Sequence, residues 1–372
     1  MNKKWRQTFF ILITACFFIL GSCKGKKEAS WEGQIETIDN VIVVNNPKTP
    51  LLPDHAVELE EELSLGGAKG SGPFQFSNMR QVGVDEQDRI FILDDKESHI
   101  KLFDSEGGYL FTFGKPGQGP GELNGPRRMC IRKNQALVSE YGRRLSYFSL
   151  KGEFLRSISL KEVWGLRVRF DSQGNIYVTE GVLDPSDPRY VLKKFTGNME
   201  FVRELARTPA PKPNEAFNPF MAVDYWQIRT DDYLVYGYPK TYELQVFDPE
   251  GNVIRKITRE YDPVEVTEEE KQEQLEELGD MRDQIEVNFS KFHSAYYWFV
   301  LDETGNIYVR TWKAAPDGAG FIYDLFDQEG KYRARFPLRG SLQAANKNKL
   351  YTIEEDDEGY QTAKRYRLLL KQ

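Results

Sequence analysis

Short apolar stretches alternate with polar turns along the chain from about residue 55 onwards. In the first clear unit these stretches fall at Gln81–Val84, Ile90–Leu93, Ile100–Phe103 and Tyr109–Phe113. They are rich in β-branched and aromatic residues, which favour strands. The segments between them carry Asp and Gly, which favour tight turns. The pattern predicts a unit of four short antiparallel strands.

This unit recurs along the chain, and we name its four strands a to d in chain order. The turn between its first two strands, the a–b turn, carries the clearest repeated motif. The sequence Asp-Ser-Gln-Gly-Asn-Ile-Tyr-Val begins at Asp171, and a near copy begins at Asp302. A looser copy begins at Asp85. The Asp side chain can accept bonds from backbone N–H groups ahead of it, and Gly tolerates positive φ. A repeat of strands and turns at a period of about 40–50 residues is typical of propeller blades.

A second motif, a phenylalanine before Asp-x-x-Gly or a weaker form of it, marks the end of the third strand in each unit. Successive copies of this phenylalanine are about one blade length apart, except for the last two, because a charged insert lies between them. The anchors are Phe103, Phe148, Phe195, Phe247 and Phe326.

Five anchored units leave a C-terminal remainder that must form a sixth. Its predicted strands lie near Leu342–Ala345, Lys349–Ile353 and Lys364–Leu370, and we expect Val57–Leu65 to supply the fourth. Such a splice closes the ring and removes exposed sheet edges. The prediction for residues 55–372 is an all-β fold, a six-bladed β-propeller of four-stranded antiparallel blades.

The insert, at about residues 265–290, lies between blades four and five, and Thr267–Val287 is its predicted helix. Thr267 and Glu270 form a capping box. Two roles stay open: a helix packed on the disc, and a partner-docking helix or lid. Apolar residues recur on one face at helical spacing. They are Leu275, Leu278, Met281 and Ile285.

A glycine-rich connector, Phe113–Leu123, precedes Pro126. Together with the two turn motifs, it makes the chain resemble the NHL-repeat group of six-bladed propellers, and in particular the propeller lipoproteins common in gut Bacteroidetes. The resemblance covers roughly residues 55–372, although blades four and six depart from the motif. The connector also looks like a phosphate loop, but no parallel strand–helix unit surrounds it.

The N-terminus predicts export and lipidation. A short basic start precedes the apolar run Phe9–Leu20, which is too short for a spanning helix of about 20 residues and fits a secretory signal. The run ends at Leu-Gly-Ser-Cys23, which resembles the lipobox of bacterial lipoproteins. The resemblance implies a signal peptide over residues 1–22, acylation of Cys23, and a tether and N-terminal segment over 23–54. The alternative is an ordinary signal peptide in which Cys23 is incidental.

The residue that follows Cys23 and the positions of the other cysteines extend this prediction to the location and stability of the protein. Lys24 rather than Asp follows Cys23, so we expect a lipid anchor in the cell envelope, at the outer membrane, on its periplasmic or surface side. Cys16 would leave with the leader, so Cys130 would be the single free thiol and no internal disulfide could form. We expect a monomer held together by packing.

The composition and charge of the chain limit the classes of function that it can have. The formal net charge of -7 gives no electrostatic basis for binding nucleic acid. The three histidines are far apart, and no hydrolase or zinc motif occurs, so we assign no catalytic residue, metal or cofactor. The sequence favours a non-enzymatic binding module for an unknown glycan, peptide or protein. The alternative is a lactonase-like hydrolase or lyase with a channel metal, and it rests on fold analogy alone.

The repeat order also predicts which face binds. The a–b and c–d turns are short, whereas the b–c and d–a connections are long and varied, so we expect function on the second, loop-rich face. Arginine with aromatic residues suits anionic or carbohydrate ligands, although packing between blades would explain about half of these side chains. The predicted ligand-binding residues are Arg80, Arg127, Arg128, Trp164, Arg167, Trp226, Tyr297, Trp298 and Trp312.

Overall fold

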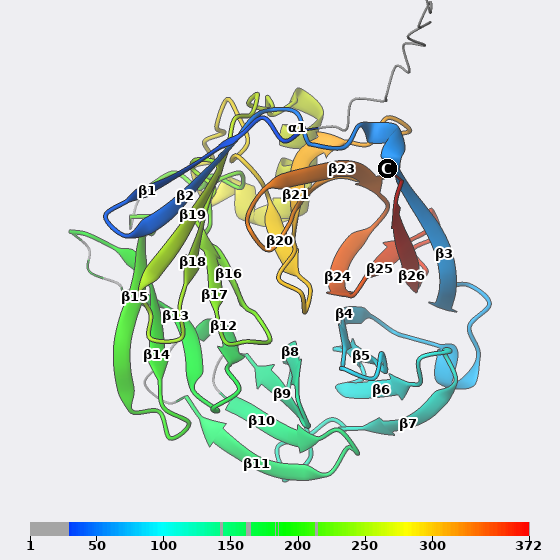
Figure 1. The fold of residues 1–372 in the computed structure, drawn as a ribbon. Helices are drawn as coiled ribbons and strands as arrows, with labels where there is room; N and C mark the ends of the chain where they lie inside the picture. The colour runs from blue at the N-terminus through cyan, green and yellow to red at the C-terminus, as the bar shows by residue number, and fades with distance from the viewer. Residues whose placement is uncertain are drawn as a thin grey trace, which may run out of the picture. The chain divides into compact units, whose positions relative to one another are not determined.

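Six sheets form a ring in the computed structural model, with their inner strands facing the centre of the ring (Figure 1). This confirms the predicted six-bladed β-propeller. The structure describes residues 30–371, apart from 142–143, 161–164, 183, 185 and 213–214.

The blades follow one another along the chain and are counted here from β4. The first holds β4 (Met79–Val84), β5 (Ile90–Asp94), β6 (His99–Phe103) and β7 (Tyr109–Phe113). The second holds β8 (Pro126–Arg132), β9 (Gln135–Glu140), β10 (Arg144–Ser149) and β11 (Phe154–Ser159). The third holds β12 (Gly165–Phe170), β13 (Ile176–Val182), β14 (Arg189–Phe195) and β15 (Phe201–Pro209).

The remaining blades complete the ring. The fourth holds β16 (Tyr225–Ile228), β17 (Leu234–Gly237), β18 (Glu243–Phe247) and β19 (Val253–Arg259). The fifth holds β20 (Trp298–Leu301), β21 (Ile307–Ala314), β22 (Phe321–Phe326) and β23 (Tyr332–Leu338). The sixth holds β24 (Ser341–Asn346), β25 (Lys349–Glu355), β26 (Gln361–Leu370) and, from the N-terminal side, β3 (Val57–Gly66).

The pairing of β3 with β26 is the predicted splice. The two strands are antiparallel, with Val57 opposite Leu370 and Leu65 opposite Ala363. Glu62 accepts a hydrogen bond from Arg365 Nε at 3.0 Å across this pair. Distant parts of the chain thus share one sheet, which covers an edge that would otherwise be open.

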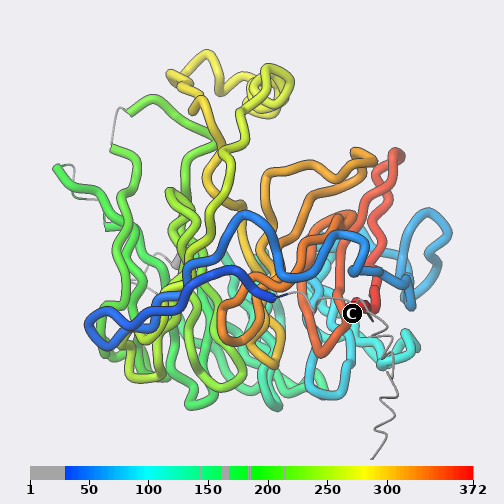
Figure 2. The backbone as a smooth tube through the Cα atoms, turned by 45° about the horizontal axis from the view of Figure 1, so that its top comes forward, coloured from blue at the N-terminus to red at the C-terminus, as the bar shows by residue number. Residues whose placement is uncertain are grey.

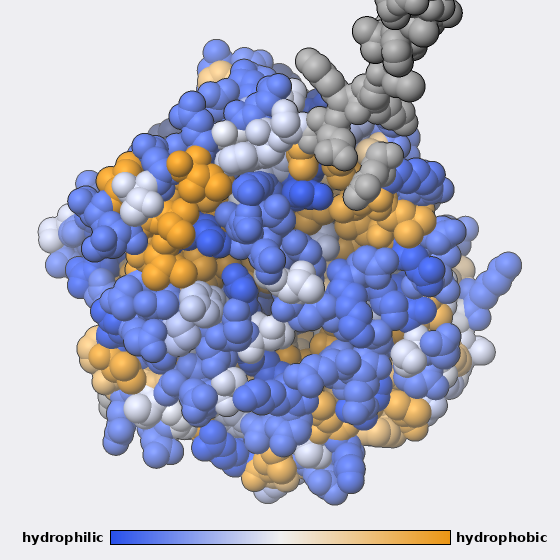
Figure 3. Space-filling view, in the orientation of Figure 1, coloured by the Kyte–Doolittle hydropathy of each residue, from blue (hydrophilic) through white to orange (hydrophobic). Residues whose placement is uncertain are grey.

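The N-terminal segment also forms a hairpin, which the repeat pattern did not predict. β1 (Gln34–Ile38) and β2 (Val41–Asn46) extend the fourth blade, with β2 parallel to β19. Buried Asn46 fixes the hairpin to blade five, because its amide donates to Gly330 O (2.9 Å) and its oxygen accepts from Tyr332 N (2.7 Å). Figure 3 shows apolar surface gathered near these strands, on an otherwise mostly hydrophilic face.

The core is divided into six clusters, one between each pair of neighbouring blades. All five phenylalanine anchors are buried, and each lies at a register shift just before its c–d turn. The anchors therefore recur because every blade must fill the same space against its neighbour.

The a–b turn motif has an equally local cause. Asp171 Oδ1 accepts from the backbone N–H groups of Gln173 (3.0 Å) and Asn175 (2.8 Å). Its other oxygen accepts from the Asn175 amide and the Tyr177 hydroxyl. One carboxylate therefore explains why Asp, Asn and Tyr recur together, and the copy at Asp302 repeats these bonds.

The insert lies between β19 and β20, as predicted, but its helix is shorter than expected. α1 (Glu268–Leu278) begins with the predicted capping box and stops at Gly279, whose φ is 50°. A 3-10 turn, Gly279–Asp283, follows, and no residue of either element is buried. Figure 2 shows the insert projecting from the disc. In the described part of the chain, no helix is long and apolar enough to cross a membrane.

Two further 3-10 turns complete the described elements. They are η1 (Asp54–Ala56), which leads into β3, and η2 (Gly72–Phe74), which precedes β4.

Candidate ligand-binding site

The channel has two chemically different ends. Each inner strand begins near the long d–a connection and ends at its a–b turn, so one end of the channel is surrounded by loops and the other by turns. The positions of the charged side chains along these strands therefore decide which face can bind a ligand.

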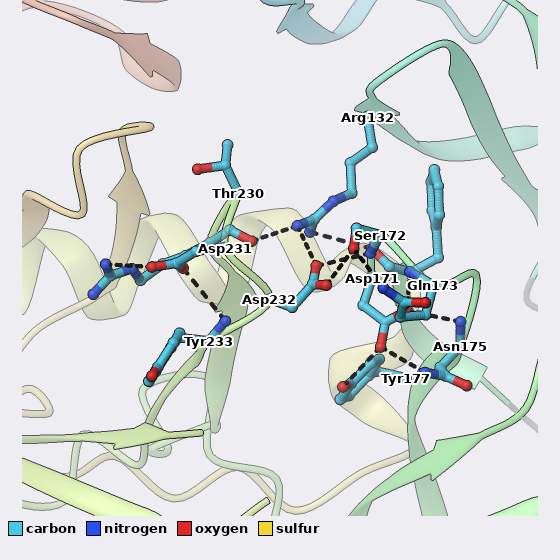
Figure 4. A network of polar contacts seen from close by, with 12 residues as sticks. Arg132, Asp171, Ser172, Gln173, Asn175, Tyr177, Thr230, Asp231, Asp232 and Tyr233 are labelled. Carbon is cyan, nitrogen blue, oxygen red and sulfur yellow. Dashed lines mark hydrogen bonds and ion pairs between the residues drawn. The ribbon is translucent and has the colours of Figure 1, made fainter. Parts of the chain in front are cut away.

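At the turn end, charged groups pair across blades (Figure 4). Arg132, at the end of β8, donates to Asp232 Oδ1 at 3.0 Å and to Phe170 O at 3.3 Å. The same carboxylate accepts from Ser172 N at 2.7 Å and from the Ser172 hydroxyl. Asp232 thus joins blades two, three and four through one buried carboxylate.

Similar contacts between carboxylates and donors of neighbouring blades recur around the ring. Asp88 in blade one accepts from Lys349 Nζ at 2.8 Å and from the Asn346 amide, both of blade six. Glu303 in blade five accepts from the Lys347 backbone N–H at 2.7 and 2.8 Å. These contacts join different blades at the turn end, and we call them the interblade clasps.

A cavity of about 300 Å³ also lies at the turn end, lined by residues of the inner strands and a–b turns. Its lining includes Arg132 and Glu303, whose charges the clasps already use. Arg169 and the free thiol of Cys130 line it as well. Toward the middle of the channel, then, the cavity reaches an arginine outside the clasps.

Arginines in the inner strands of the first three blades lie along the channel, and Arg169 among them reaches the turn-end cavity. Burial lowers the pKa of Arg128, and the nearby charges of Arg169, Arg80 and Arg167 lower it further, although Tyr225 acts in the opposite direction. Arg128 and Arg169 are half-buried. Within the described residues, Arg80, Arg128 and Arg169 form no ion pair. We call Arg80, Arg128, Arg167 and Arg169 the arginine cluster.

Arg167 is the member of the cluster with a partner. It donates to Asp224 O, and its guanidinium lies 3.7 Å from the Asp224 carboxylate. Burial raises the pKa of Asp224, whereas the charge of Arg167 opposes that shift. Arg167 also lies over the Tyr225 ring, 5.3 Å from its centroid. One carboxylate therefore faces a group of four positive charges.

A row of aromatic rings leads away from the arginine cluster. Ring centroids are 5.9 Å apart for Tyr225 and Trp298, 6.4 Å for Trp298 and Tyr297, and 4.7 Å for Tyr297 and Trp312. Tyr297 is 47% exposed. The row ends where Trp312 stacks on His293 at 4.1 Å, beneath the insert. We call these rings the aromatic row.

The insert is attached at the end of this row. His293 Nε2 lies 3.1 and 3.2 Å from the two carboxylate oxygens of Glu270, the residue that closes the capping box of α1. Burial lowers the pKa of His293, and Glu270 acts to raise it. A cavity of about 340 Å³ beside the insert is lined by Trp312, Lys313 and Arg259 among others.

The structure gathers several of the predicted site residues and leaves others apart. Arg80, Arg128 and Arg167 meet in the arginine cluster, and Tyr297, Trp298 and Trp312 lie in the aromatic row. Trp226 is 1% exposed and donates to Thr179 Oγ1 at 2.7 Å, so it packs between blades three and four.

Two other predicted residues do not join the site. Arg127 lies over the exposed ring of Tyr141, with its guanidinium carbon 4.8 Å from the ring centroid. Trp164 and Cys23, the predicted lipidation residue, lie outside the described residues.

Arg169 and Tyr225 belong to the site but were not among the predicted residues. Arg169 follows Arg167 at strand period, so the two side chains share one face of β12. Tyr225 occupies the first position of β16, beside the tryptophan that the sequence singled out. The alternation Arg-Val-Arg in an inner strand was the available signal for the first of these.

Among the described residues, no group of three or more His, Cys, Asp or Glu side chains is placed to hold a metal ion.

Comparison with known proteins identifies the family of the propeller. The family model described as DUF5128, 6-bladed beta-propeller, matches residues 71–360. Among curated proteins, the Drosophila melanogaster protein brain tumor is 29% identical over 111 residues. That alignment covers 28% of this chain and 11% of the relative, so the chain spans only about a tenth of that protein.

Two solved structures share the fold. A member of the DUF4221 family from Bacteroides vulgatus has a TM-score of 0.58 and 14% identity, covering 85% of this chain and 99% of its own. A Bacteroides fragilis protein named as exported has a TM-score of 0.55 and 13% identity, covering 88% and 99%. At such identities the likeness concerns the fold alone.

Proposed function

The chain belongs to the DUF5128 family of six-bladed β-propellers, and on that premise we propose that it is a lipid-anchored binding module of the cell envelope whose ligand docks on the loop-rich face. One observation carries the proposal: a row of aromatic rings that includes the half-exposed ring of Tyr297 lies at the loop end of the channel. At the turn end, by contrast, the carboxylates of Asp88, Asp232 and Glu303 are used in the interblade clasps.

The binding face is tested by comparing a loop-face variant with a turn-face variant. Full chain is purified in detergent and applied to an array of neutral and acidic oligosaccharides and peptides. We expect Tyr297→Ala to lose the ligands that the wild type captures, because this half-exposed ring lies in the aromatic row.

The matched control for that experiment is Asp327→Ala, on the opposite face. Asp327 accepts from the N–H groups of Glu329 (3.0 Å) and Lys331 (2.9 Å) within its own turn. This variant should lose stability and keep the ligands. Retention by Tyr297→Ala together with loss by a folded Asp327→Ala would place binding on the other face and contradict the proposal.

The envelope location rests on the leader and the lipobox-like sequence ending at Cys23. Several acyl chains together hold a protein on a membrane, whereas a single chain is marginal. Cells that express the chain with radiolabelled palmitate should label the wild type and Cys16→Ala but not Cys23→Ala. Equal labelling of Cys23→Ala, or its unchanged sedimentation with membranes, would contradict lipidation at this residue.

A further inference from the structure

We propose that the β1–β2 hairpin lies on the bilayer that holds the lipid anchor, with Ile35, Ile38 and Ile42 in contact with lipid. The inference rests on the proposed acylation of Cys23 and goes beyond it, because it states how the propeller meets the membrane. Three features carry it: the exposed apolar side chains of the hairpin, its attachment to the disc and the length of chain that joins it to Cys23.

The first feature is a set of exposed isoleucines. Ile35 and Ile38 are each 50% exposed, and Ile42 is 36% exposed. β1 is the outermost strand of its sheet and pairs with β2 alone in the described chain. Proteins ordinarily cover or charge such an edge, and exposed apolar groups that gather in one place mark an interaction surface. Figure 3 shows the apolar surface near these strands.

The isoleucines lie on both faces of the hairpin. In the register of the two strands, Ile35 and Ile42 share one face, whereas Ile38 lies on the other. A second protein surface would cover one face of this edge, because a folded surface is solid. Lipid is fluid and surrounds an inserted edge on both sides. The arrangement therefore favours a bilayer over a protein as the occupant.

Polar groups set the depth of this contact. Glu36 lies between the isoleucines and accepts from Asn45 Nδ2 at 2.9 Å, and Asp39 and Asn40 form the turn. The outer edge of β1 also carries backbone N–H and C=O groups that have no partner strand in the described chain, and the hydrocarbon core does not tolerate such an edge. We expect the hairpin at headgroup level, where amphipathic segments bury their apolar side about 5–10 Å deep.

The second feature is the firm attachment of the hairpin to the disc. β2 runs parallel to β19 over Ile42–Asn46, and Val44 within it is fully buried. Trp31, just before β1, donates from Nε1 to Asn46 Oδ1 at 3.0 Å. Contact between the hairpin and lipid would therefore set the orientation of the propeller on the membrane.

The third feature is the short chain between the anchor and the hairpin. Cys23 precedes Ser30 by seven residues and Ile35 by twelve. A chain spans at most about 3.6 Å per residue, so the first of these stretches reaches about 25 Å at full extension. A folded domain of about 340 residues has a radius of gyration of about 20 Å, so this linker is about as long as the radius of the propeller. The side that carries the hairpin must therefore stay near the bilayer.

The test places an environment-sensitive label on the hairpin of the processed, lipidated chain. Ile38→Cys is made together with Cys130→Ser, so that the introduced thiol is the one that reacts with a nitrobenzoxadiazole label. The labelled protein is reconstituted into phosphatidylcholine vesicles that contain doxyl-labelled phosphatidylcholine. We expect the emission to shift to the blue and to lose intensity through quenching by the doxyl lipid, whereas iodide in the water quenches it weakly.

Ile42→Cys, on the other face, is the second label position, and Leu155→Cys is the matched control. Leu155 is 46% exposed in β11, which lies across the ring from β1 in Figure 1. The label at position 42 should respond like the label at position 38, because lipid surrounds both faces. The label at position 155 should be quenched by iodide and not by the doxyl lipid. Circular dichroism verifies that each variant is folded.

Quenching of both hairpin labels by iodide and not by doxyl lipid, in protein that stays with the vesicles, would overturn the inference and leave the anchor standing. Equal doxyl quenching at position 155 would also contradict it. A blue shift that appears in detergent and grows with protein concentration would replace the bilayer with a second copy of the chain. Protein that leaves the vesicles because Cys23 carries no lipid would overturn the proposed anchor and this inference with it.

Discussion

Strand β8 carries one arginine at each end of the channel, and the two have opposite surroundings. Arg132, at the turn end, bonds to Asp232 and to two backbone oxygens across blades. Arg128, at the loop end, lies near three other arginines and has no ion pair in the described chain. The two arginines of this strand thus differ: Arg132 joins blades through its partners, whereas Arg128 forms no ion pair in the described chain.

The comparison predicts its largest effect at the interblade clasps. Arg132→Gln should lower the free energy of unfolding by about 3 kcal/mol, because it leaves a buried carboxylate without its ion partner. Urea unfolding followed by circular dichroism measures this change. A loss below about 0.5 kcal/mol, the range of ordinary surface substitutions, would show that the clasp is dispensable.

The a–b turns should be next in importance. Asp171→Ala removes the acceptor for Gln173, Asn175 and Tyr177, so it should cost about 2 kcal/mol of stability. The same urea experiment tests it, with Ser186→Ala in an exposed loop as the control. An Asp171→Ala variant as stable as that control would mean that the repeated motif has no structural role.

At the loop end, the insert should respond to acid. Burial lowers the pKa of His293, so the folded state holds it neutral while the unfolded chain takes up a proton below about pH 6.5. The stability that neutral His293 contributes to the folded state is therefore fully present above that pH and is lost as the pH falls. Glu270 is the charged side chain that contacts it in the described chain.

We expect the fluorescence of Trp312, which stacks on His293, to change and the midpoint of urea unfolding to fall as the pH is lowered below about 6.5. His293→Gln removes the titrating group and should flatten both curves. If the wild type and this variant respond alike, the pH dependence arises elsewhere.

The smallest stability effect should come from the arginine cluster. Arg128→Gln removes one of several like charges and breaks no ion pair of the described chain, so its unfolding free energy should stay within about 0.5 kcal/mol of the wild type. A slight gain at low salt would fit relief of repulsion. A loss of 2 kcal/mol or more would reveal a structural role for Arg128.

The sequence predicted those parts of the fold that depend on neighbouring residues. The strands of blade one, the capping box at Thr267 and the splice of β3 were visible because turns, strands and repeats leave local patterns. The β1–β2 hairpin was not, because it pairs with β19, far along the chain and in parallel. The predicted helix ran too far, because Gly279 ends it despite continuing apolar spacing.

The site was predicted in part for the same reason. Repeat alignment predicted Arg80, Arg128 and Arg167 at one level of the channel, and in the structure all three lie in inner strands, where the charges of Arg80 and Arg167 act on Arg128. It could not show that Trp226 points into the neighbouring blade, because its partner Thr179 comes from another repeat. Whether a side chain lines the channel or packs between blades depends on such contacts.

The most direct test of the comparison measures stability and capture of ligands on the oligosaccharide and peptide array together for Arg132→Gln and Tyr297→Ala. We predict opposite results: Arg132→Gln is destabilised by about 3 kcal/mol and, where folded, captures the same ligands as the wild type. Tyr297→Ala keeps most of the wild-type stability, because its ring is half exposed, and loses those ligands. If both variants lose stability and affinity in parallel, the two ends of the channel do not divide structure from binding.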